Sequence, residues 1–183
     1  MEHFSTERLI ARDWAASDDQ AAFAIYGRPE VSRWLGAPPQ TVGSLAEMRQ
    51  RLARIIERSA DRPRFGLWPL ELRDGGQVIG AVVLSPLAGG DREDYEIGWH
   101  LNPDYWGHGY ATEAGRGAIG LAFGDYALDR VLAVVYPANL RSLAVCRRLG
   151  MTPHGQTDRY YGVTLELFPL SRDAGEPAGP AGG

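Results

Sequence analysis

The segment RVLAVVYP, residues 130–137, restricts the possible folds more than any other part of the chain. Its residues are almost all apolar, and a strand without a polar face has to be covered on both sides. Helical patterns precede it (109–123) and follow it (140–149), so helices can supply the covering layers. The segment therefore predicts an α/β fold in which helices flank a central sheet.

The order of the other elements predicts the type of sheet. We expect a strand at 6–14, a short helix at 17–27, and an amphipathic helix at 44–59. Strands follow at 65–72 and 77–87, joined by a turn at Gly75-Gly76, and at 94–102. One or two further strands close the chain between residues 152 and 170. This order favours a partly antiparallel, partly parallel sheet, and it differs from the regular alternation of a dinucleotide-binding fold.

Length, charge and cysteine content limit the function classes. A chain of 183 residues fits one domain, which we place at residues 1–170, with a Gly/Pro/Ala-rich tail at 171–183. The net charge of −4 and the lack of a basic run argue against direct nucleic-acid binding. A single cysteine and four histidines without ligand spacing predict no metal site. Without an apolar leader or a long apolar segment, we expect a cytoplasmic protein that does not bind membranes.

The segment YWGHGYATEA, residues 105–114, is the strongest candidate for a binding site. Gly107 and Gly109 allow close approach of a ligand to the backbone, and the helix that follows directs unpaired amides and a partial positive charge toward it. An anion, such as a phosphate or pyrophosphate, fits this arrangement. Taken alone, a G-x-G turn is equally consistent with a structural connection between a strand and a helix. Neither a nucleoside triphosphate loop nor the third glycine of a dinucleotide loop is present.

Two long segments, EIGWHLNPDYWGHGYATEA (96–114) and DRVLAVVYPANLRSLAVCRRLGM (129–151), resemble the GNAT N-acetyltransferase superfamily. They are most similar to its branch of ribosomal-protein N-terminal acetyltransferases, RimJ and RimL. STERLIARDW (5–14) and VIGAVVLSPL (78–87) match the same branch in the same order. The resemblance implies a mostly antiparallel sheet of six to seven strands. It also implies that the sheet splays between its fourth strand (95–101) and its fifth strand (130–136).

The resemblance also implies a site for acetyl-CoA. The family signature Q/R-x-x-G-x-G/A falls on Trp106, Gly109 and Ala111, with tryptophan in place of the usual Gln or Arg. Backbone amides at residues 107–111 would hold the pyrophosphate, and amides of the fourth strand would hold the pantetheine arm and the thioester oxygen. The implied cofactor-binding residues are Trp99, Leu101, Trp106, Gly107, His108, Gly109, Tyr110, Ala111, Thr112, Asn139 and Ser142.

Candidate catalytic residues follow from the same resemblance. Glu96, at the start of the fourth strand, is the expected general base, either directly or through a water molecule. Its acidic neighbours Glu93 and Asp94 are alternatives, and a solvated strand end would also explain this acidic run. Ser142 is the expected proton donor to the thiolate. Asn139 could contact pantetheine, cap the following helix, or do both.

Cys146 stands where many family members carry a tyrosine acid, which leaves Ser142 or water to protonate the thiolate. We interpret this cysteine as a small buried residue rather than a nucleophile, because no histidine lies near it in sequence. His100 on the fourth strand is a weaker polar candidate near the substrate. Five aromatic residues could line an acceptor pocket or belong to the core: Trp34, Trp68, Trp99, Tyr160 and Tyr161.

The predicted activity is acetyl transfer from acetyl-CoA to a primary amine, either a protein N-terminus or a small molecule. Use of another acyl-CoA and a non-catalytic acyl-CoA sensor are the alternatives. The sequence leaves the acceptor and the oligomeric state open, and an exposed sheet edge would allow a homodimer.

Overall fold

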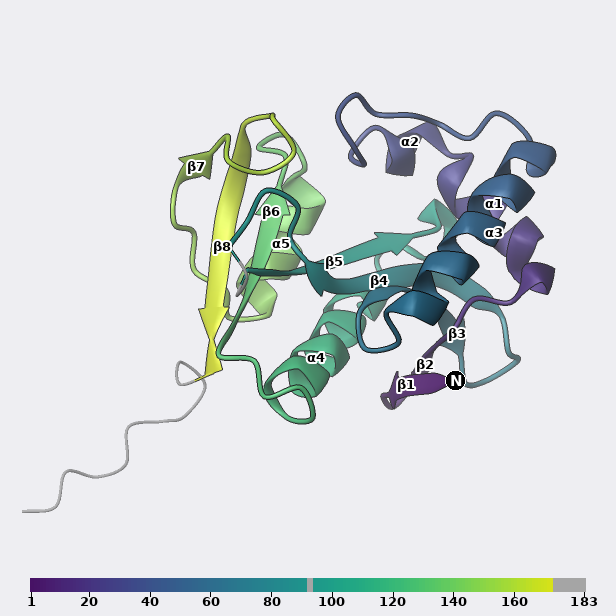
Figure 1. The fold of residues 1–183 in the computed structure, drawn as a ribbon, viewed down its shortest axis with the longest axis horizontal. Helices are drawn as coiled ribbons and strands as arrows, with labels where there is room; N and C mark the ends of the chain where they lie inside the picture. The colour runs from purple at the N-terminus through teal and green to yellow at the C-terminus, as the bar shows by residue number, and fades with distance from the viewer. Residues whose placement is uncertain (92–93, 173–183) are drawn as a thin grey trace, which may run out of the picture.

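A computed structural model describes residues 1–91 and 94–172, and its centre is one eight-stranded sheet of order β1-β2-β3-β4-β5-β6-β8-β7 (Figure 1). The strands are β1 (Glu2–Ser5), β2 (Leu9–Arg12), β3 (Gly66–Leu72), β4 (Val78–Pro86), β5 (Tyr95–Leu101), β6 (Arg130–Val135), β7 (Gln156–Thr157) and β8 (Leu165–Ser171). The α/β fold and the mixed, mostly antiparallel sheet are confirmed. Part of the predicted tail, residues 173–183, lies outside the described residues.

The sheet has one strand more than the six to seven that we predicted. The strand expected at 6–14 is present in part, as β2 at Leu9–Arg12, but residues 6–8 form a turn that joins it to β1, a strand that we did not predict. Thr6 closes this turn: its N–H donates to the Leu9 carbonyl at 2.9 Å, and its hydroxyl oxygen accepts the Leu9 N–H at 3.1 Å. The two strands pair antiparallel. The turn residues are not glycine or proline, so the sequence gives no strong signal for it.

In the described part of the chain, five α-helices surround the sheet: α1 (Asp19–Tyr26), α2 (Pro29–Ser32), α3 (Leu45–Asp61), α4 (Tyr110–Phe123) and α5 (Leu140–Arg148). The amphipathic pattern that we identified becomes α3. Its first residue follows Ser44, whose hydroxyl accepts the Glu47 N–H at 3.2 Å and caps the helix. Sequence analysis missed α2, because four residues are too few to show a helical period.

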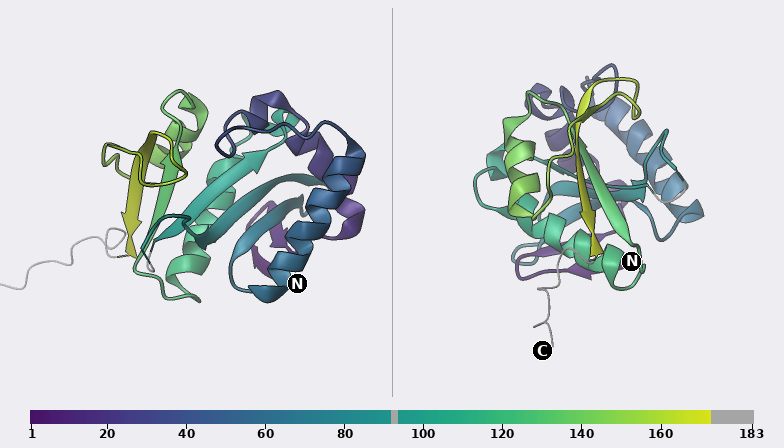
Figure 2. Two further views of the ribbon diagram at one scale, coloured as in Figure 1. Left: turned by 45° about the horizontal axis from the view of Figure 1, so that its top comes forward. Right: turned by 90° about the vertical axis from the view of Figure 1, so that its left-hand side faces the viewer.

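The helices form layers on the sheet. Helices α1 and α3 lie together over one face, and α4 lies against the other (Figure 2). Each layer has its own buried cluster. Ala22, Met48 and Leu52 belong to the first cluster, while Ala114 and Ala118 of α4 belong to the second. The layers cover β4, which contacts both α1 and α4. On β6, helices α4 and α5 cover one side, whereas Leu132 on the other side packs with Leu87 and Tyr160. The segment at 130–137 is therefore covered on both sides, but helices supply only one of the two covering layers.

The sheet opens between β5 and β6. Strand β5 pairs with β4 along its whole length, but it pairs with the parallel strand β6 at a single position, Glu96 with Leu132. Strand β6 then pairs along its length with β8. The predicted splay between the strands at 95–101 and 130–136 is therefore confirmed, and Figure 1 shows the two strands diverging.

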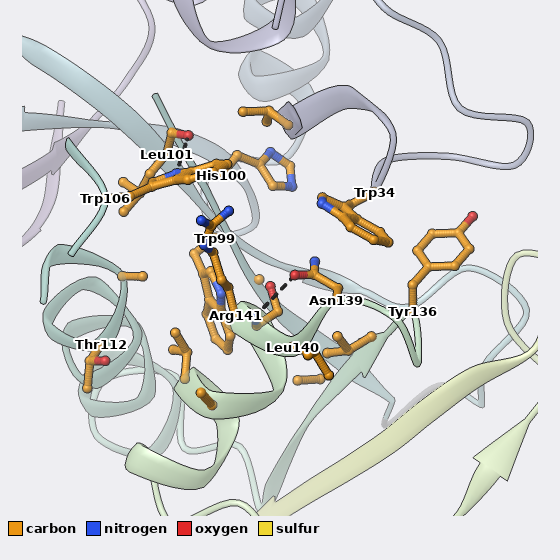
Figure 3. Close-up of a pocket in the computed structure, with 18 of the residues that line it drawn as sticks. Trp34, Trp99, His100, Leu101, Trp106, Thr112, Tyr136, Asn139, Leu140 and Arg141 are labelled. Carbon is orange, nitrogen blue, oxygen red and sulfur yellow. Dashed lines mark hydrogen bonds between the residues drawn. The ribbon is translucent and has the colours of Figure 1, made fainter. Parts of the chain in front are cut away.

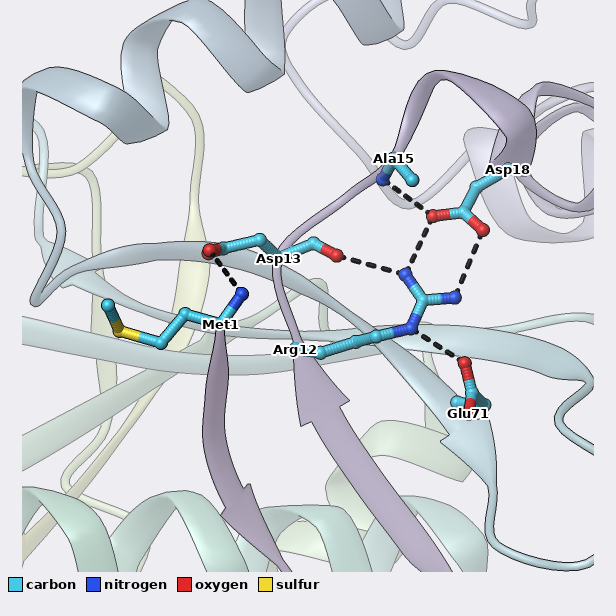
Figure 4. A network of polar contacts seen from close by, with 6 residues as sticks. All are labelled: Met1, Arg12, Asp13, Ala15, Asp18 and Glu71. Carbon is cyan, nitrogen blue, oxygen red and sulfur yellow. Dashed lines mark hydrogen bonds and ion pairs between the residues drawn. The ribbon is translucent and has the colours of Figure 1, made fainter.

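A polar network fixes the N-terminal hairpin to the rest of the fold (Figure 4). Arg12 donates to both carboxylate oxygens of Asp18, at 2.8 and 3.0 Å, and to Glu71 on β3 at 2.6 Å. Asp18 also accepts the Ala15 N–H at 2.8 Å. Arg12 therefore joins β2, β3 and the segment before α1.

Within residues 1–91 and 94–172, none of the helices combines the length and apolar character that crossing a bilayer requires.

Candidate functional site

A cavity of about 890 Å³ occupies the opening between β5 and β6 (Figure 3). Strands β5 and β6 form its walls, while the turn before α4 and the first residues of α5 close one end. Trp34 and Tyr136 lie at another end, with ring centroids 6.2 Å apart. The volume lies within the range of roughly 300–1,000 Å³ typical of small-molecule sites.

The cavity brings together ten of the eleven predicted cofactor residues and the predicted base, Glu96. The ten are Trp99, Leu101, Trp106, Gly107, Gly109, Tyr110, Ala111, Thr112, Asn139 and Ser142. His108 does not line the cavity. Its ring is exposed and lies 5.9 Å from the ring of Tyr110, while its carbonyl accepts from the side chain of Arg8.

Strand β5 directs free backbone groups into this cavity. The N–H of Asn102 donates to Ile79 of β4, and successive residues of a strand alternate in direction. The amides of Trp99 and Leu101 therefore point the other way, toward β6. Because β5 and β6 meet only at Glu96 and Leu132 among the described strands, these amides line the opening rather than a strand ladder. The Leu101 carbonyl accepts the indole N–H of Trp106 at 3.0 Å, so this tryptophan fixes the end of β5.

The glycine turn has the conformation that a close ligand requires. Gly107 and Gly109 have φ angles of +86° and +83°, which other residues adopt at a cost. A Cβ atom at Gly107 would meet no atom within 4 Å, so the turn leaves open space along the cavity. Gly109 is also the residue before α4, whose first amides face this space. The turn therefore fits an anionic group such as a diphosphate.

Arg8 holds this turn in place. Its guanidinium donates to the His108 carbonyl at 3.1 Å and pairs with Glu113 of α4 at 2.6 Å. It also lies 4.5 Å from the centre of the Tyr110 ring. Sequence analysis missed this role, because Arg8 and Glu113 are 105 positions apart and no local pattern connects them.

Two arginines of the α5 region add positive charge beside the turn. Arg141 stacks on Trp106 at 4.4 Å, and Arg148 donates to the Thr112 hydroxyl at 3.1 Å. Both line the cavity. Sequence analysis missed them as well, although a signal existed: residues seven positions apart in a helix lie on the same face.

The start of α5 shows the capping that we considered for Asn139. Its side-chain oxygen accepts the Ser142 N–H at 3.3 Å, and both side chains line the cavity. Cys146, one turn further on, is completely buried, and this burial raises the pKa of its thiol to about 12. Such a thiol is neutral at physiological pH, which agrees with our interpretation of Cys146 as a packing residue.

Glu96 lies where the two splayed strands still pair, and it receives one side-chain hydrogen bond. The hydroxyl of Tyr161 donates to it at 2.5 Å. Burial raises the pKa of Glu96 above its ordinary value, and the Tyr161 hydrogen bond acts in the opposite direction. Tyr161 has a φ of +59°, a conformation that bulky residues rarely adopt and that often marks functional sites.

The acidic neighbours of Glu96 do not share its position. Asp94 does not line the cavity and is held by Arg130 at 2.6 Å and Tyr160 at 3.1 Å. Burial acts to raise its pKa, but the hydrogen bonds from Asp91, Tyr160 and Arg130 lower it below the ordinary value. The geometry therefore favours Glu96 over Asp94 as an acid–base group. Glu93 lies outside the described residues.

Comparison with known proteins agrees with this geometry. Residues 8–152 match the sequence profile of the acetyltransferase (GNAT) domain. The chain belongs to the GNAT family. The N-acetyltransferase YnaD of Bacillus subtilis is 29% identical over 175 residues, which cover 90% of this chain and 97% of YnaD.

Solved GNAT structures share the fold. RimJ from Mycobacterium smegmatis, in complex with CoA-disulfide, superposes with a TM-score of 0.74 at 21% identity, covering 90% of this chain and 82% of RimJ. RimL, a ribosomal L7/L12 alpha-N-protein acetyltransferase in complex with coenzyme A, superposes with a TM-score of 0.76 at 17% identity, covering 95% and 99%. The predicted family and its RimJ and RimL neighbours are confirmed, and so is the enzyme class: this GNAT protein is an acetyltransferase.

This GNAT domain has a second, smaller cavity of about 310 Å³ beside the first. Six residues line both cavities: Trp34, Leu35, Glu96, His100, Val134 and Tyr136. Of the five aromatic candidates, Trp34, Trp99 and Tyr161 line the cavities. Trp68 and Tyr160 are buried and do not line them.

Proposed function

We propose that this chain is an acetyl-CoA-dependent N-acetyltransferase that transfers the acetyl group directly to a primary amine. One observation carries this proposal: a single cavity contains a glycine turn that fits an anion, the free amides of β5 and the half-buried carboxylate of Glu96. We propose further that residues 1–170 form one acetyltransferase domain and that the protein works in the cytoplasm.

The donor would lie along the opening between β5 and β6. The amides of residues 107–111 would bind the pyrophosphate of acetyl-CoA, with Arg141 and Arg148 adding charge. The pantetheine arm would then lie along β5, with Asn139 beside it. The presence of CoA in the solved RimJ and RimL structures supports this choice of donor.

The transfer chemistry needs a base, an oxyanion site and an acid. Glu96 would take a proton from the acceptor ammonium, directly or through water, and the neutral amine would attack the thioester carbon. An amide of β5, at Trp99 or Leu101, would donate to the oxygen of the tetrahedral intermediate. As the carbon–sulfur bond breaks, the attacking nitrogen would lose its remaining excess proton to water, and Ser142 or water would give a proton to the thiolate. The products are the N-acetylated amine and CoA.

A longer acyl-CoA donor and a non-catalytic acyl-CoA sensor are the competing interpretations. A sensor needs the donor site but no base. The raised pKa of Glu96, a carboxylate that lines the donor cavity, therefore supports an enzyme.

Titration calorimetry and a turnover assay test the proposal together. We expect acetyl-CoA to bind and at least one class of primary amine to release CoA from it. Binding without turnover on any amine would favour the sensor. If turnover is faster with a longer acyl-CoA than with acetyl-CoA, the longer acyl-CoA is the preferred donor and our choice of acetyl-CoA is wrong.

A further inference from the structure

The smaller cavity pairs the proposed base with an arginine. Among its lining residues are one carboxylate, Glu96, and one cation, Arg51 of α3. Glu96 also lines the donor cavity, whereas Arg51 lines only the smaller one. An acceptor whose amine reaches Glu96 from the smaller cavity therefore has its remaining atoms near Arg51.

The charge of Arg51 is not neutralised within the described part of the chain. No carboxylate there forms an ion pair with it, and its guanidinium lies 4.9 Å from the centre of the Tyr26 ring. Tyr26 in turn contacts His100, with 3.2 Å between its hydroxyl and Nδ1. Burial and then the nearby Arg51 lower the pKa of His100 to about 4, so His100 is neutral at physiological pH. Burial raises the pKa of Tyr26, so it is neutral as well.

We infer that the acceptor is a small amine that carries a carboxylate, which Arg51 binds while Glu96 receives the amine. This inference rests on the proposed function and names its substrate class, that of the free amino acids and related amino-carboxylic acids. A guanidinium matches a carboxylate through two parallel hydrogen bonds. The cavity has one arginine, which neutralises one negative charge, and this favours a carboxylate over a doubly charged phosphate.

The size of the cavity favours a small molecule over a protein N-terminus. Its volume of about 310 Å³ lies at the lower end of the range for small-ligand sites. In a peptide, the first residue continues into a neutral amide where a free amino acid has its carboxylate. A peptide would therefore cover Arg51 without pairing its charge, which is costly.

The test compares acids with their own amides. The full-length protein is assayed for CoA release with α-, β- and γ-amino acids, with the corresponding amino amides, and with short peptides. We expect kcat/KM to be about ten- to a hundredfold higher for the acid than for its amide in the preferred pair, the factor expected for a hydrogen bond to a charged group.

Variants at two arginines of α3 test whether the Arg51 side chain causes this preference. Arg51→Gln should abolish the preference for acids, and Arg51→Lys should keep part of it. Arg54→Gln is the matched control, because Arg54 is exposed on the same helix and lines neither cavity. Calorimetry with acetyl-CoA verifies that each variant is folded.

Two outcomes would overturn the inference while leaving the proposed function standing: equal rates with acids and amides, or turnover with peptides alone. A preference for acids that persists in Arg51→Gln would also overturn it. The wild-type comparison needs no variant, so a misfolded variant does not prevent the test. If acetyl-CoA binds but no amine of any class is acetylated, the proposed function fails and the inference falls with it.

Discussion

At the scale of single residues, burial and the hydrogen bond from Tyr161 act in opposite directions on the acidity of Glu96, the proposed base. Burial raises the pKa of Glu96, while this hydrogen bond stabilises the carboxylate and counteracts the rise. Glu96 acts only when it is deprotonated, so activity is lost as the pH falls through its pKa.

Tyr161→Phe should therefore move the acidic limb of the pH profile. Without the hydrogen bond the pKa of Glu96 rises further, so the fall in kcat/KM should begin at a higher pH than in the wild type. The measurement is log kcat/KM against pH. Tyr95→Phe is the control, because Tyr95 precedes Glu96 on β5 and stacks on Phe65 instead. If the acidic limb does not move, Glu96 is not the group whose protonation lowers kcat/KM at low pH.

Replacing the base itself should separate activity from stability. Glu96→Gln should lower kcat by about 10²- to 10⁴-fold, with the largest loss at low pH, where most of the amine is protonated. Glutamine can still accept from Tyr161, and it removes a charge that burial disfavours. The melting temperature should therefore be equal or higher. Wild-type turnover at low pH would remove Glu96 from the mechanism.

The glycine turn offers a test of the donor site. Gly109→Val should weaken acetyl-CoA binding by roughly tenfold or more, because the φ of +83° costs about 1–2 kcal/mol for a residue with a Cβ, so the turn should change its conformation. The added side chain would also lie against Arg8, which holds the turn: the Cβ would be 3.6 Å from the Arg8 guanidinium. Calorimetry measures the affinity. Gly75→Val has a similar φ of +88° but lies in the turn between β3 and β4, so it should leave the affinity unchanged. Equal affinities in both variants would contradict the assignment.

At the scale of elements, Arg12 makes the N-terminal hairpin part of the sheet's framework. Asp18 and Glu71 are largely buried and depend on Arg12 for their charge pairing. Arg12→Met should lower the free energy of unfolding by about 2–3 kcal/mol, somewhat less than the loss of a fully buried partner. Urea titration measures this change.

An exposed ion pair provides the comparison for Arg12. Arg28 pairs with Asp104 at 3.0 Å, and both side chains are well exposed to solvent. Arg28→Met should therefore cost about 1 kcal/mol or less. Equal losses for the two variants would show that the Arg12 network adds no more than a surface pair.

The sequence predicted the elements whose signals are local. Helix α3 follows from its apolar spacing and from Ser44, and β6 follows from its continuous apolar residues. The turn at Thr6 and the four-residue helix α2 escaped prediction, because neither has a glycine signal or a full helical period.

The candidate site divides in the same way. The glycine turn and Asn139 each lie within a continuous sequence motif, at 96–114 and at 129–151, so each could be identified from neighbouring residues. Arg8 and Arg51 could not, because the fold brings them to the site from distant segments. Tyr161 was a candidate for the acceptor pocket, but its contact with Glu96 could not be predicted. The bond between Tyr161 and Glu96, for example, spans 65 positions.

At the scale of the whole molecule, the splayed sheet separates the two proposed substrates. The donor cavity lies in the opening between β5 and β6, the smaller cavity lies beside it, and Glu96 lines both. The two cavities have six lining residues in common, and their other lining residues differ. Under the proposed function, donor and acceptor would be bound at the same time, with the reacting atoms near Glu96.

The burial of Cys146 also predicts the form of the rate law. No thiolate is available at that position to carry the acetyl group between two half-reactions, since the side chain is fully buried and its thiol stays protonated. Initial rates measured against acetyl-CoA at several fixed amine concentrations should give intersecting lines in double-reciprocal plots. Parallel lines, together with a labelled acetyl group retained on the protein, would contradict this expectation. Under the proposed direct transfer, the opening at the single bridge between β5 and β6 would hold a ternary complex, in which no product has to leave before the second substrate binds.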